Sequence, residues 1–307
     1  MPENLSTDAQ PEKASNVLPD WVNKLGSVLR ILAVVSPGLA AKIMAIIWFK
    51  PFMSEPKKHV IDWQNSAQQK IDISLGQAFL FRNEDHIDEQ QPLVVCVHGW
   101  RGRAHQMRRF VPELLELGFR VVVVNLPAHS GQGRNYTHIF EGADMLQEIQ
   151  KSVGPIDSVI AHSFGSPVTT FALNENLQLR KFIMVAPNID FRYLLNNYAK
   201  SFGLQRLIPK IEEDIKQHCD QKIFLGSWDK LTMETLQEHL MHVEEVQIWH
   251  DVLDTEINIE INQILVQSLL ERKQAAKIIE VQDVGHFNVL KDQDTVAGIC
   301  RSLMKEV

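Results

Sequence analysis

One serine, Ser163, stands where an apolar run ends, in the stretch VIAHSFG at residues 159–165. The run predicts a strand, and residues 166–174 predict a helix that follows at once. So sharp a turn from strand to helix strains the serine backbone and lifts the hydroxyl off the sheet edge. It also brings together the residues two positions before and after the serine, which are the small Ala161 and Gly165. Ser163 is therefore a candidate nucleophile, although Ser-x-Gly after an apolar run is usually only a turn.

A nucleophilic serine needs a general base, and His286 has the best setting among the twelve histidines. It follows Gly285 in a short loop between a predicted strand at 276–281 and a final helix at 292–305. That loop lies at the carboxyl edge of the sheet, where Ser163 is also expected.

Three other histidines have weaker settings. The side chain of His162 is expected to point away from the site, although it adjoins the serine. His250 ends a predicted strand, and His129 lies in the loop PAHSGQG; either is expected to support the site from behind.

The remaining partner is an acid that lies between the serine and the histidine in the chain. Asp254 and Asp251 both follow the predicted strand at 245–250, and Asp254 is the first choice because it lies on the loop proper. Asp251 is the second choice, and Asp229 the third. The acid would hold His286 in the correct tautomer and stabilise its imidazolium form. Helix capping is the structural alternative for Asp254 and Asp251.

Two backbone amides complete the predicted site. Residues 92–97 predict a buried strand that ends in His98-Gly99-Trp100. Gly99 lets the backbone pass close to a ligand, so the amide of Trp100 can face the amide of Phe164 across an oxyanion. His98 is expected to be a structural hydrogen-bonding residue behind this loop. The alternative is a plain turn between strand and helix.

Strands and helices alternate around these residues, which predicts a mostly parallel sheet flanked by helices. The strands are expected within 70–81, 92–97, 120–126, 157–162, 181–187, 245–250 and 276–281, and the helices at 104–117, 140–152, 166–174, 257–273 and 292–305. Residues 190–240 interrupt this alternation of strands and helices, and their pattern predicts a small helical cap. The fold class is α/β, with the main domain over 61–189 and 241–307.

The N-terminal segment has a different pattern. Residues 1–17 predict a disordered tail, and residues 18–60 predict a helical extension without the pattern of a secretory signal. Asp20 can cap a first helix, whose expected apolar face is Trp21, Leu25, Val28, Leu29 and Leu32.

A second helix of this extension is expected to begin at Ser36-Pro37 and to end at Pro51. Its length of about 20 Å is too short for a hydrocarbon core of about 30 Å. The two helices are expected to pack on the main domain or, through residues 20–50, to lie at a membrane surface.

Composition narrows the functional classes. The chain has 307 residues, 45% apolar and 22% charged, as globular proteins of enzyme size do. A net charge of −7 with scattered cations disfavours nucleic-acid partners. Cys96, Cys219 and Cys300 form neither a disulfide framework nor a zinc pattern, so we expect no metal, a buried Cys96 and a cytoplasmic protein, soluble or peripheral to the membrane.

Four arginines form a local cluster, Arg101, Arg103, Arg108 and Arg109. A solvated helix face is the favoured interpretation. Recognition of an acidic substrate, such as a CoA thioester, is the alternative.

Taken together, residues 70–305 resemble the α/β-hydrolase superfamily. The resemblance is carried, in the family order, by His98-Gly99-Trp100, the loop LPAHSGQG, Ala161-His162-Ser163-Phe164-Gly165, Asp254 and Gly285-His286. The stretch HGWRGRAHQ is similar to a bacterial subgroup of esterase-like hydrolases with an N-terminal helical extension. The family's usual Gly is Ala161 here, which is still small.

The resemblance implies a serine hydrolase that cleaves carboxylic esters or thioesters through an acyl-enzyme on Ser163, without a cofactor. Dehalogenases and epoxide hydrolases of this fold use an aspartate where this chain has the serine, so their chemistry is disfavoured. Two alternatives stay open. The same residues could serve a peptidase, a C–C hydrolase or an acyltransferase, or the chain could be a hydrolase-fold binding protein at a membrane surface without turnover.

Overall fold

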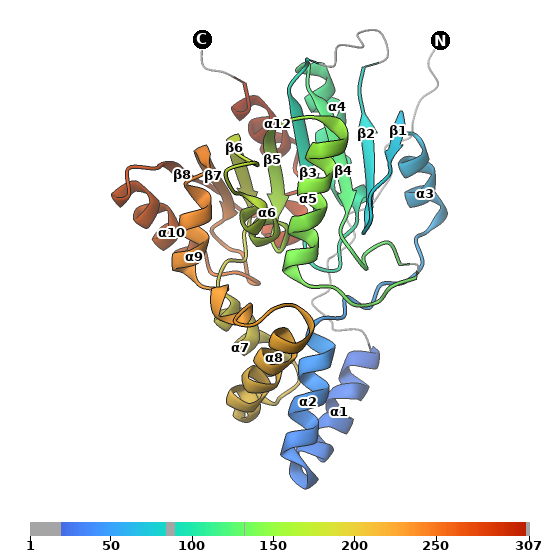
Figure 1. Ribbon diagram of the computed structural model, residues 1–307, viewed down its shortest axis with the longest axis vertical. Helices are drawn as coiled ribbons and strands as arrows, with labels where there is room; N and C mark the ends of the chain where they lie inside the picture. The colour runs from blue at the N-terminus through green and yellow to red at the C-terminus, as the bar shows by residue number, and fades with distance from the viewer. Residues whose placement is uncertain (1–19, 84–89, 132, 305–307) are drawn as a thin grey trace.

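A computed structural model describes residues 20–83, 90–131 and 133–304, with side chains in the first helix from residue 24 onward. The chain forms one sheet with helices on both faces, and a second helical layer lies beyond one end of the strands (Figure 1). The predicted α/β class is therefore confirmed. The tail expected at 1–17 and the side chains of Asp20 and Trp21 lie outside what the structure describes.

Within the described residues, eight strands make the sheet. They are β1 (Gln69–Ile71), β2 (Gln77–Phe81), β3 (Leu93–Val97), β4 (Arg120–Asn125), β5 (Ile156–His162), β6 (Leu179–Val185), β7 (Val243–Asp251) and β8 (Ala275–Val281). Their order is β1-β2-β4-β3-β5-β6-β7-β8, and only β2 runs antiparallel to its neighbours. Strands β3 and β4 are buried along their whole length, as their continuous apolar runs predict.

Helices connect the strands. They are α1 (Asp20–Val35), α2 (Pro37–Trp48), α3 (Lys58–Asn65), α4 (Phe110–Glu116), α5 (Ile139–Val153), α6 (Gly165–Ala172), α7 (Phe191–Ser201), α8 (Ile208–Lys222), α9 (Met233–Leu240), α10 (Ile259–Glu271), α11 (Gly285–Asn288) and α12 (Gln293–Ser302). Three short 3₁₀ helices are η1 (Ala104–Met107), η2 (Gln205–Leu207) and η3 (Trp228–Lys230).

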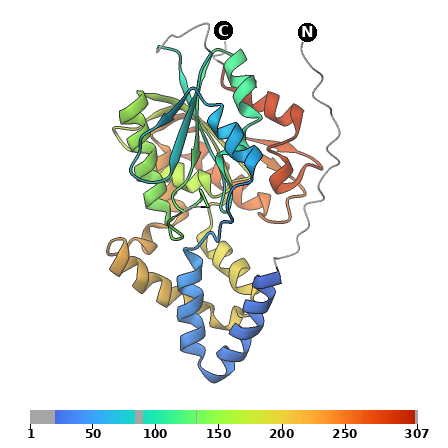
Figure 2. The ribbon, with the colours of Figure 1, turned by 90° about the vertical axis from the view of Figure 1, so that its right-hand side faces the viewer.

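The sheet separates two apolar cores. Helices α5, α6, α9 and α10 cover one face, and α4 and α12 pack together on the other (Figure 2). Along β4, Val122 and Val124 point into the first core, and Val121 and Val123 point into the second, because side chains alternate along a strand. Cys96 is buried in the second core, as expected.

The second helical layer joins two distant parts of the chain. Helix α2 packs between α1 and α8, so the N-terminal pair contacts the helices after β6. Arg30 donates a hydrogen bond to the Phe202 carbonyl at 3.0 Å, and the Tyr198 hydroxyl donates one to the Met44 carbonyl at 2.8 Å. None of the helices within the described ranges has the length and apolar character needed to cross a membrane.

Some local predictions were wrong. The helix expected over 104–117 is divided into η1 and α4, and Pro112 in the first turn of α4 has no amide hydrogen to donate to the Arg108 carbonyl four residues earlier. Val28 is 61% exposed, since the buried face of α1 runs through Leu29 and Ala33. His286 lies in the short helix α11 rather than in a loop.

The arginine cluster does not form one solvated helix face. Arg103 donates to the Ser54 carbonyl, and Arg108 donates to the His105 carbonyl at 3.1 Å. Burial lowers the pKa of both guanidinium groups from the ordinary value. Arg101 stays exposed, beside the cavity described below.

Candidate active site

Ser163 lies in the turn between β5 and α6, with a positive φ of 49°. This left-handed conformation costs a non-glycine residue about 1–2 kcal/mol, so the surrounding contacts must impose it. The Ser163 amide donates to the Val185 carbonyl of β6 at 2.9 Å, and the Ser163 carbonyl accepts from the Ser166 amide at 3.0 Å. The strained turn expected at this serine is therefore present.

The need for a small residue after the serine has a more specific cause than the one predicted. A Cβ atom at Gly165 would lie 2.7 Å from the His98 carbonyl oxygen and 2.8 Å from the Val97 carbonyl oxygen. Gly165 thus packs against the end of β3. Ala161 is fully buried within β5, where it pairs with Val97 and with Met184.

The loop after β3 touches the serine. A Cβ atom at Gly99 would lie 3.0 Å from the Ser163 Cβ, so the backbone passes directly beside the nucleophile candidate. The rings of Trp100 and Phe164 meet edge to face, with centroids 5.0 Å apart. The two residues whose amides are the oxyanion candidates therefore adjoin one another and Ser163.

His98 holds this loop from behind. Its Nε2 accepts the Leu126 amide at 3.0 Å, so its Nδ1 carries the proton and donates it to the Gly99 carbonyl at 2.7 Å. Burial lowers the pKa of His98 well below its ordinary value, which keeps the ring neutral and this tautomer populated. His129 lies 5.1 Å from the rings of both His98 and Trp100, and burial lowers its pKa to about 4.

His286 and Asp254 are directly joined. The His286 Nδ1 lies 2.7 Å from the Asp254 Oδ2, and the Asp254 side chain is only 1% exposed. The other carboxylate oxygen, Oδ1, accepts the amides of Glu256 at 2.7 Å and Ile257 at 3.0 Å. These bonds fix the carboxylate plane, so Asp254 both caps the turn and orients the histidine.

His250 provides a second support for the same carboxylate. Its Nε2 lies 3.2 Å from the Asp254 Oδ2, and its Nδ1 accepts from the Asn262 amide at 2.9 Å. The same Asn262 amide group donates to the Pro187 carbonyl at 3.1 Å, which fixes its orientation. His250 therefore donates its Nε2 proton to Asp254.

The pKa of Asp254 is lowered from its ordinary value. Burial acts to raise it, but the hydrogen bonds from His250 and His286 outweigh burial. Asp254 therefore stays ionised near neutral pH, and the His286 Nδ1 keeps its proton. In the neutral ring with this tautomer, the lone pair is on Nε2.

Asp251 has a different role. Its Oδ2 accepts the amides of Val284, at 2.6 Å, and of Gly285, and its Oδ1 accepts the Leu253 amide at 2.8 Å. It thus anchors the backbone of the segment that carries His286. Asp229, the third choice, forms an exposed ion pair with Lys216 at 2.7 Å, which joins η3 to α8.

His162 does not point away from this group. Its Nε2 lies 2.9 Å from the His286 carbonyl oxygen, and the two rings have centroids 4.9 Å apart. Burial, reinforced by the neighbouring His286, lowers the pKa of His162 to about 3. His162, the residue next to Ser163, thus connects β5 to α11.

Among the described residues Ser163 itself makes no hydrogen bond to His286. In serine hydrolases such a bond often forms only when substrate is bound.

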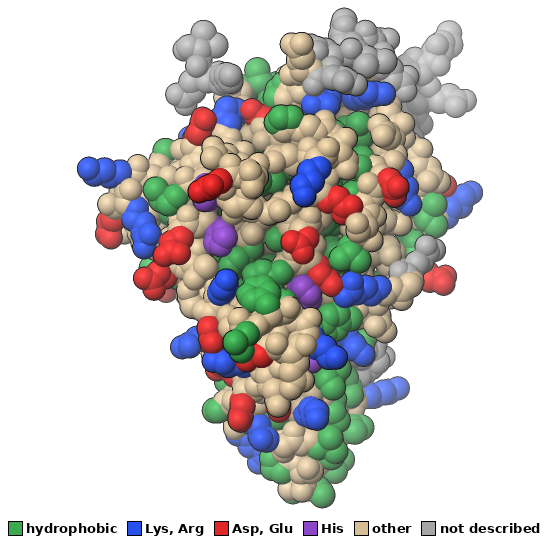
Figure 3. Space-filling view, in the orientation of Figure 1, with side chains coloured by type: hydrophobic (Ala, Val, Ile, Leu, Met, Phe, Trp, Pro, Cys, Tyr) green, Lys and Arg blue, Asp and Glu red, His purple; other side chains and the backbone are tan. Residues whose placement is uncertain are grey.

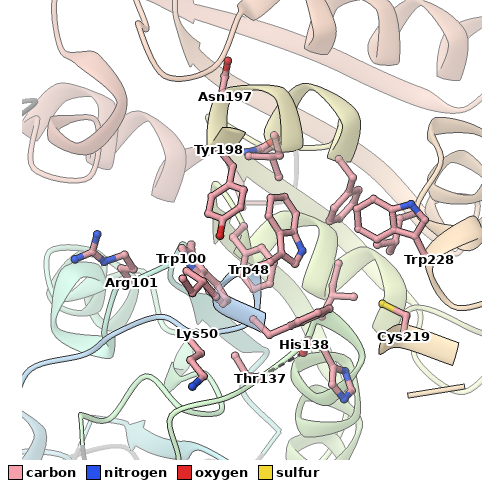
Figure 4. A pocket seen from close by; sticks show the side chains of 18 of the residues that line it. Trp48, Lys50, Trp100, Arg101, Thr137, His138, Asn197, Tyr198, Cys219 and Trp228 are labelled. Carbon is pink, nitrogen blue, oxygen red and sulfur yellow. Dashed lines mark hydrogen bonds between the residues drawn. The ribbon is translucent and has the colours of Figure 1, made fainter. Parts of the chain in front are cut away.

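A cavity of about 330 Å³ opens beside Ser163. Residues between 188 and 231 and the segments after β3, β4 and β5 supply most of its wall, but α2 and the residues after it also contribute Ile47, Trp48, Phe49, Lys50 and Phe52. Figure 4 shows Trp48 between Tyr198 and Trp228, whose ring centroids lie 5.2 and 6.2 Å from it. The residues that line the cavity are mostly apolar and include no aspartate or glutamate.

Two contributions to the site could not be found from local sequence patterns. Asn262 lies within α10, where an asparagine gives no sign that it will bond to His250. Trp48 belongs to the N-terminal pair, which the sequence placed on the main domain or at a membrane. The described residues contain no group of three or more histidine, cysteine or acidic side chains arranged to hold a metal ion.

Comparison with known proteins agrees with this architecture. The sequence pattern of the alpha/beta hydrolase family matches residues 94–299. Epoxide hydrolase B of Mycobacterium tuberculosis is 34% identical over 94 residues, which are 28% of this chain and 26% of that protein. The chain thus matches only about a quarter of that relative's length.

Solved structures share the fold at low identity. An esterase of Pyrococcus furiosus has a TM-score of 0.55 and 14% identity, covering 82% of this chain and 97% of the esterase. A monoacylglycerol lipase of Paleococcus ferrophilus has a TM-score of 0.52 and 16% identity, covering 75% and 97%. Because the family pattern spans more than half of the 307 residues, the chain belongs to the alpha/beta hydrolase family.

Proposed function

We propose that the chain is a serine hydrolase that cleaves carboxylic esters or thioesters through an acyl-enzyme on Ser163. The observation that carries the proposal is the hydrogen bond of His286 to Asp254, beside the strained turn of Ser163. A buried acid, a histidine and a strained serine together supply the parts that acyl transfer requires. The contact of His162 with the His286 backbone supports their proximity.

In this mechanism the Ser163 Oγ attacks the acyl carbonyl while the His286 Nε2 takes its proton. The carbonyl electron pair moves onto oxygen, and the amides of Trp100 and Phe164 stabilise the oxyanion. One such donor is typically worth about 3 kcal/mol of transition-state stabilisation. The pair then re-forms the carbonyl, the bond to the alcohol or thiol breaks, and His286 protonates the leaving group.

Deacylation repeats these steps with water as the nucleophile. His286 removes the water proton, the second tetrahedral intermediate collapses, and the carboxylic acid leaves as Ser163 regains its hydrogen. Asp254 stays ionised throughout and stabilises the imidazolium that forms in both halves of the reaction.

The cavity supports an apolar acyl or aryl group as the part of the substrate that is retained on the serine. Its aromatic walls favour such a group by removing apolar surface from water. The similarity to an epoxide hydrolase does not extend the proposal to epoxides, because Ser163 stands where those enzymes of this fold have an aspartate.

A fluorophosphonate probe tests the nucleophile directly. We expect stoichiometric labelling of the purified wild-type chain and loss of labelling, together with hydrolysis of p-nitrophenyl esters, in Ser163→Ala. Ser66→Ala is the matched control, because Ser66 is exposed and its hydroxyl bonds, among the described residues, only to the nearby Trp63 carbonyl. Equal ester turnover in Ser163→Ala and Ser66→Ala would refute the proposal. Labelling without turnover of any ester or thioester would leave a reactive serine but reject this reaction class.

A further inference from the structure

Between Ile31 and Val35, helix α1 is apolar on both of its faces. Leu29 and Ala33 are buried against the rest of the second helical layer. On the opposite side, the exposed fractions are 70% for Ile31, 74% for Val34 and 80% for Val35. A helix that is apolar all round is normally buried in a core or in contact with lipid, so the outward face lacks an expected partner.

The exposed side chains are aligned. Lys24, Val28, Ile31 and Val35 are spaced by four, three and four residues, so they lie along one stripe of α1. Helix α2 adds a second exposed stripe, Leu39, Lys42 and Ile46. We call the two stripes together the hairpin face. Figure 3 shows apolar side chains gathered along the tapered end of the molecule, with lysine and arginine side chains beside them.

The charge of this segment is opposite to that of the whole chain. Residues 21–54 contain Lys24, Arg30, Lys42 and Lys50, and no aspartate or glutamate, whereas the chain carries a net charge of −7. Lys24 and Lys42 are exposed and lie within the apolar stripes. A partner must therefore accept apolar side chains and neutralise positive charge along the same stripe.

We propose that the hairpin face docks on the surface of a lipid bilayer that contains anionic lipids. Its apolar side chains would enter the boundary between headgroups and acyl chains, and Lys24 and Lys42 would contact lipid phosphates. The 16 residues of α1 extend only about 24 Å, so the helix lies on the bilayer rather than across it. A second copy of the chain fits less well, because a symmetric contact would bring these cations together, and the two stripes contain no acid to pair with them.

Vesicle binding of the full-length chain tests this proposal. Sedimentation would compare pure phosphatidylcholine vesicles with vesicles containing 30% phosphatidylglycerol, at low and at high salt. We expect at least tenfold tighter binding to the anionic vesicles, weakened by salt. The double substitution Ile31→Glu/Val35→Glu should reduce binding at least tenfold.

Two further variants separate charge from apolar contact. Leu225→Glu/Ile264→Glu adds the same charge at residues that are 84% and 63% exposed outside the hairpin, and it should bind like the wild type. Lys24→Gln/Lys42→Gln should remove most of the preference for anionic vesicles. Thermal unfolding would show that each variant is folded, and because it needs no turnover it keeps this test independent of the proposed reaction.

Two results would overturn the docking proposal. One is equal vesicle binding by Ile31→Glu/Val35→Glu and by its control. The other is a wild-type dimer, seen by light scattering, that Ile31→Glu/Val35→Glu dissociates while vesicle binding is absent; that outcome would assign the hairpin face to a second copy.

Discussion

Replacing Asp254 by asparagine would test whether this carboxylate sets the tautomer of His286. The substitution keeps the shape of the side chain but replaces one oxygen by an NH₂ group. Two backbone amides, of Glu256 and Ile257, donate to Oδ1, so that position must keep an oxygen. The NH₂ group is then forced to the Oδ2 position, 2.7 Å from the His286 Nδ1.

A donor at that position reverses the tautomer of His286. His286 must accept at Nδ1 and carry its proton on Nε2, which can then no longer take the proton of Ser163. In a well-studied serine protease the same exchange lowers kcat about 10⁴-fold. We expect a loss of that order here, equivalent to about 5 kcal/mol at 1.36 kcal/mol for each factor of ten.

The measurement is kcat and KM on a short p-nitrophenyl ester, with the rate of fluorophosphonate labelling as a second readout. Asp251→Asn is the matched control, because it makes the same exchange in a carboxylate that, among the described residues, accepts only from backbone amides. It should lower the free energy of unfolding by about 1–3 kcal/mol and reduce kcat far less. If Asp254→Asn kept more than a tenth of the wild-type kcat with an unchanged Tm, the tautomer argument would fail.

Three further predictions follow from other contacts. Gly165→Ala should lower the free energy of unfolding, measured by urea titration, by about 1–3 kcal/mol and should slow probe labelling, since its Cβ would meet two backbone oxygens. Gly38→Ala is the control and should change neither quantity, because its Cβ would meet only the flexible Lys210 side chain. The pKa of His162 is about 3 in the folded chain and about 6.5 in the unfolded chain. Between these values the unfolded state binds more protons, so the free energy of unfolding decreases as the pH is lowered. From pH 6.5 to 5 this residue should contribute a loss of up to about 2 kcal/mol; an unchanged pH slope in His162→Asn would contradict that. Trp48→Ala should raise the kcat/KM ratio of octanoyl to acetyl p-nitrophenyl esters several-fold by enlarging the cavity, whereas Trp63→Ala, on α3 and outside the cavity lining, should leave the ratio unchanged.

Much of the fold could be predicted because the relevant information is local. Continuous apolar runs mark β3 and β4, and short links between alternating elements require a parallel sheet. Parallel strands bring their carboxyl ends to one edge, so Ser163, Asp254 and His286 could be placed there without any knowledge of side-chain contacts.

The choice between Asp254 and Asp251 could not be settled in the same way. Asp251 is the last residue of β7 and Asp254 lies three residues later, and both side chains accept backbone amides as capping aspartates do. What separates them is the direction of one turn, which brings the Asp254 Oδ2 to the imidazole of His286 and the Asp251 Oδ2 to the backbone before it. That direction depends on packing around β7 and α11, and no residue pattern in the chain expresses it.

The N-terminal helices show a second limit of the sequence. Their apolar residues fit burial in a protein core and contact with a lipid surface equally well. The structure shows one side of these helices buried and the other exposed. The buried side meets α8 and brings Trp48 to the cavity wall, through contacts such as the bond from Tyr198 to Met44. Deleting residues 1–55 would therefore open the cavity as well as remove the hairpin face. A truncation that lost both binding and turnover could not tell a docking surface from a substrate wall, because the same two helices supply both. Substitutions confined to the exposed stripe of α1 leave the wall intact, and they can separate the two roles.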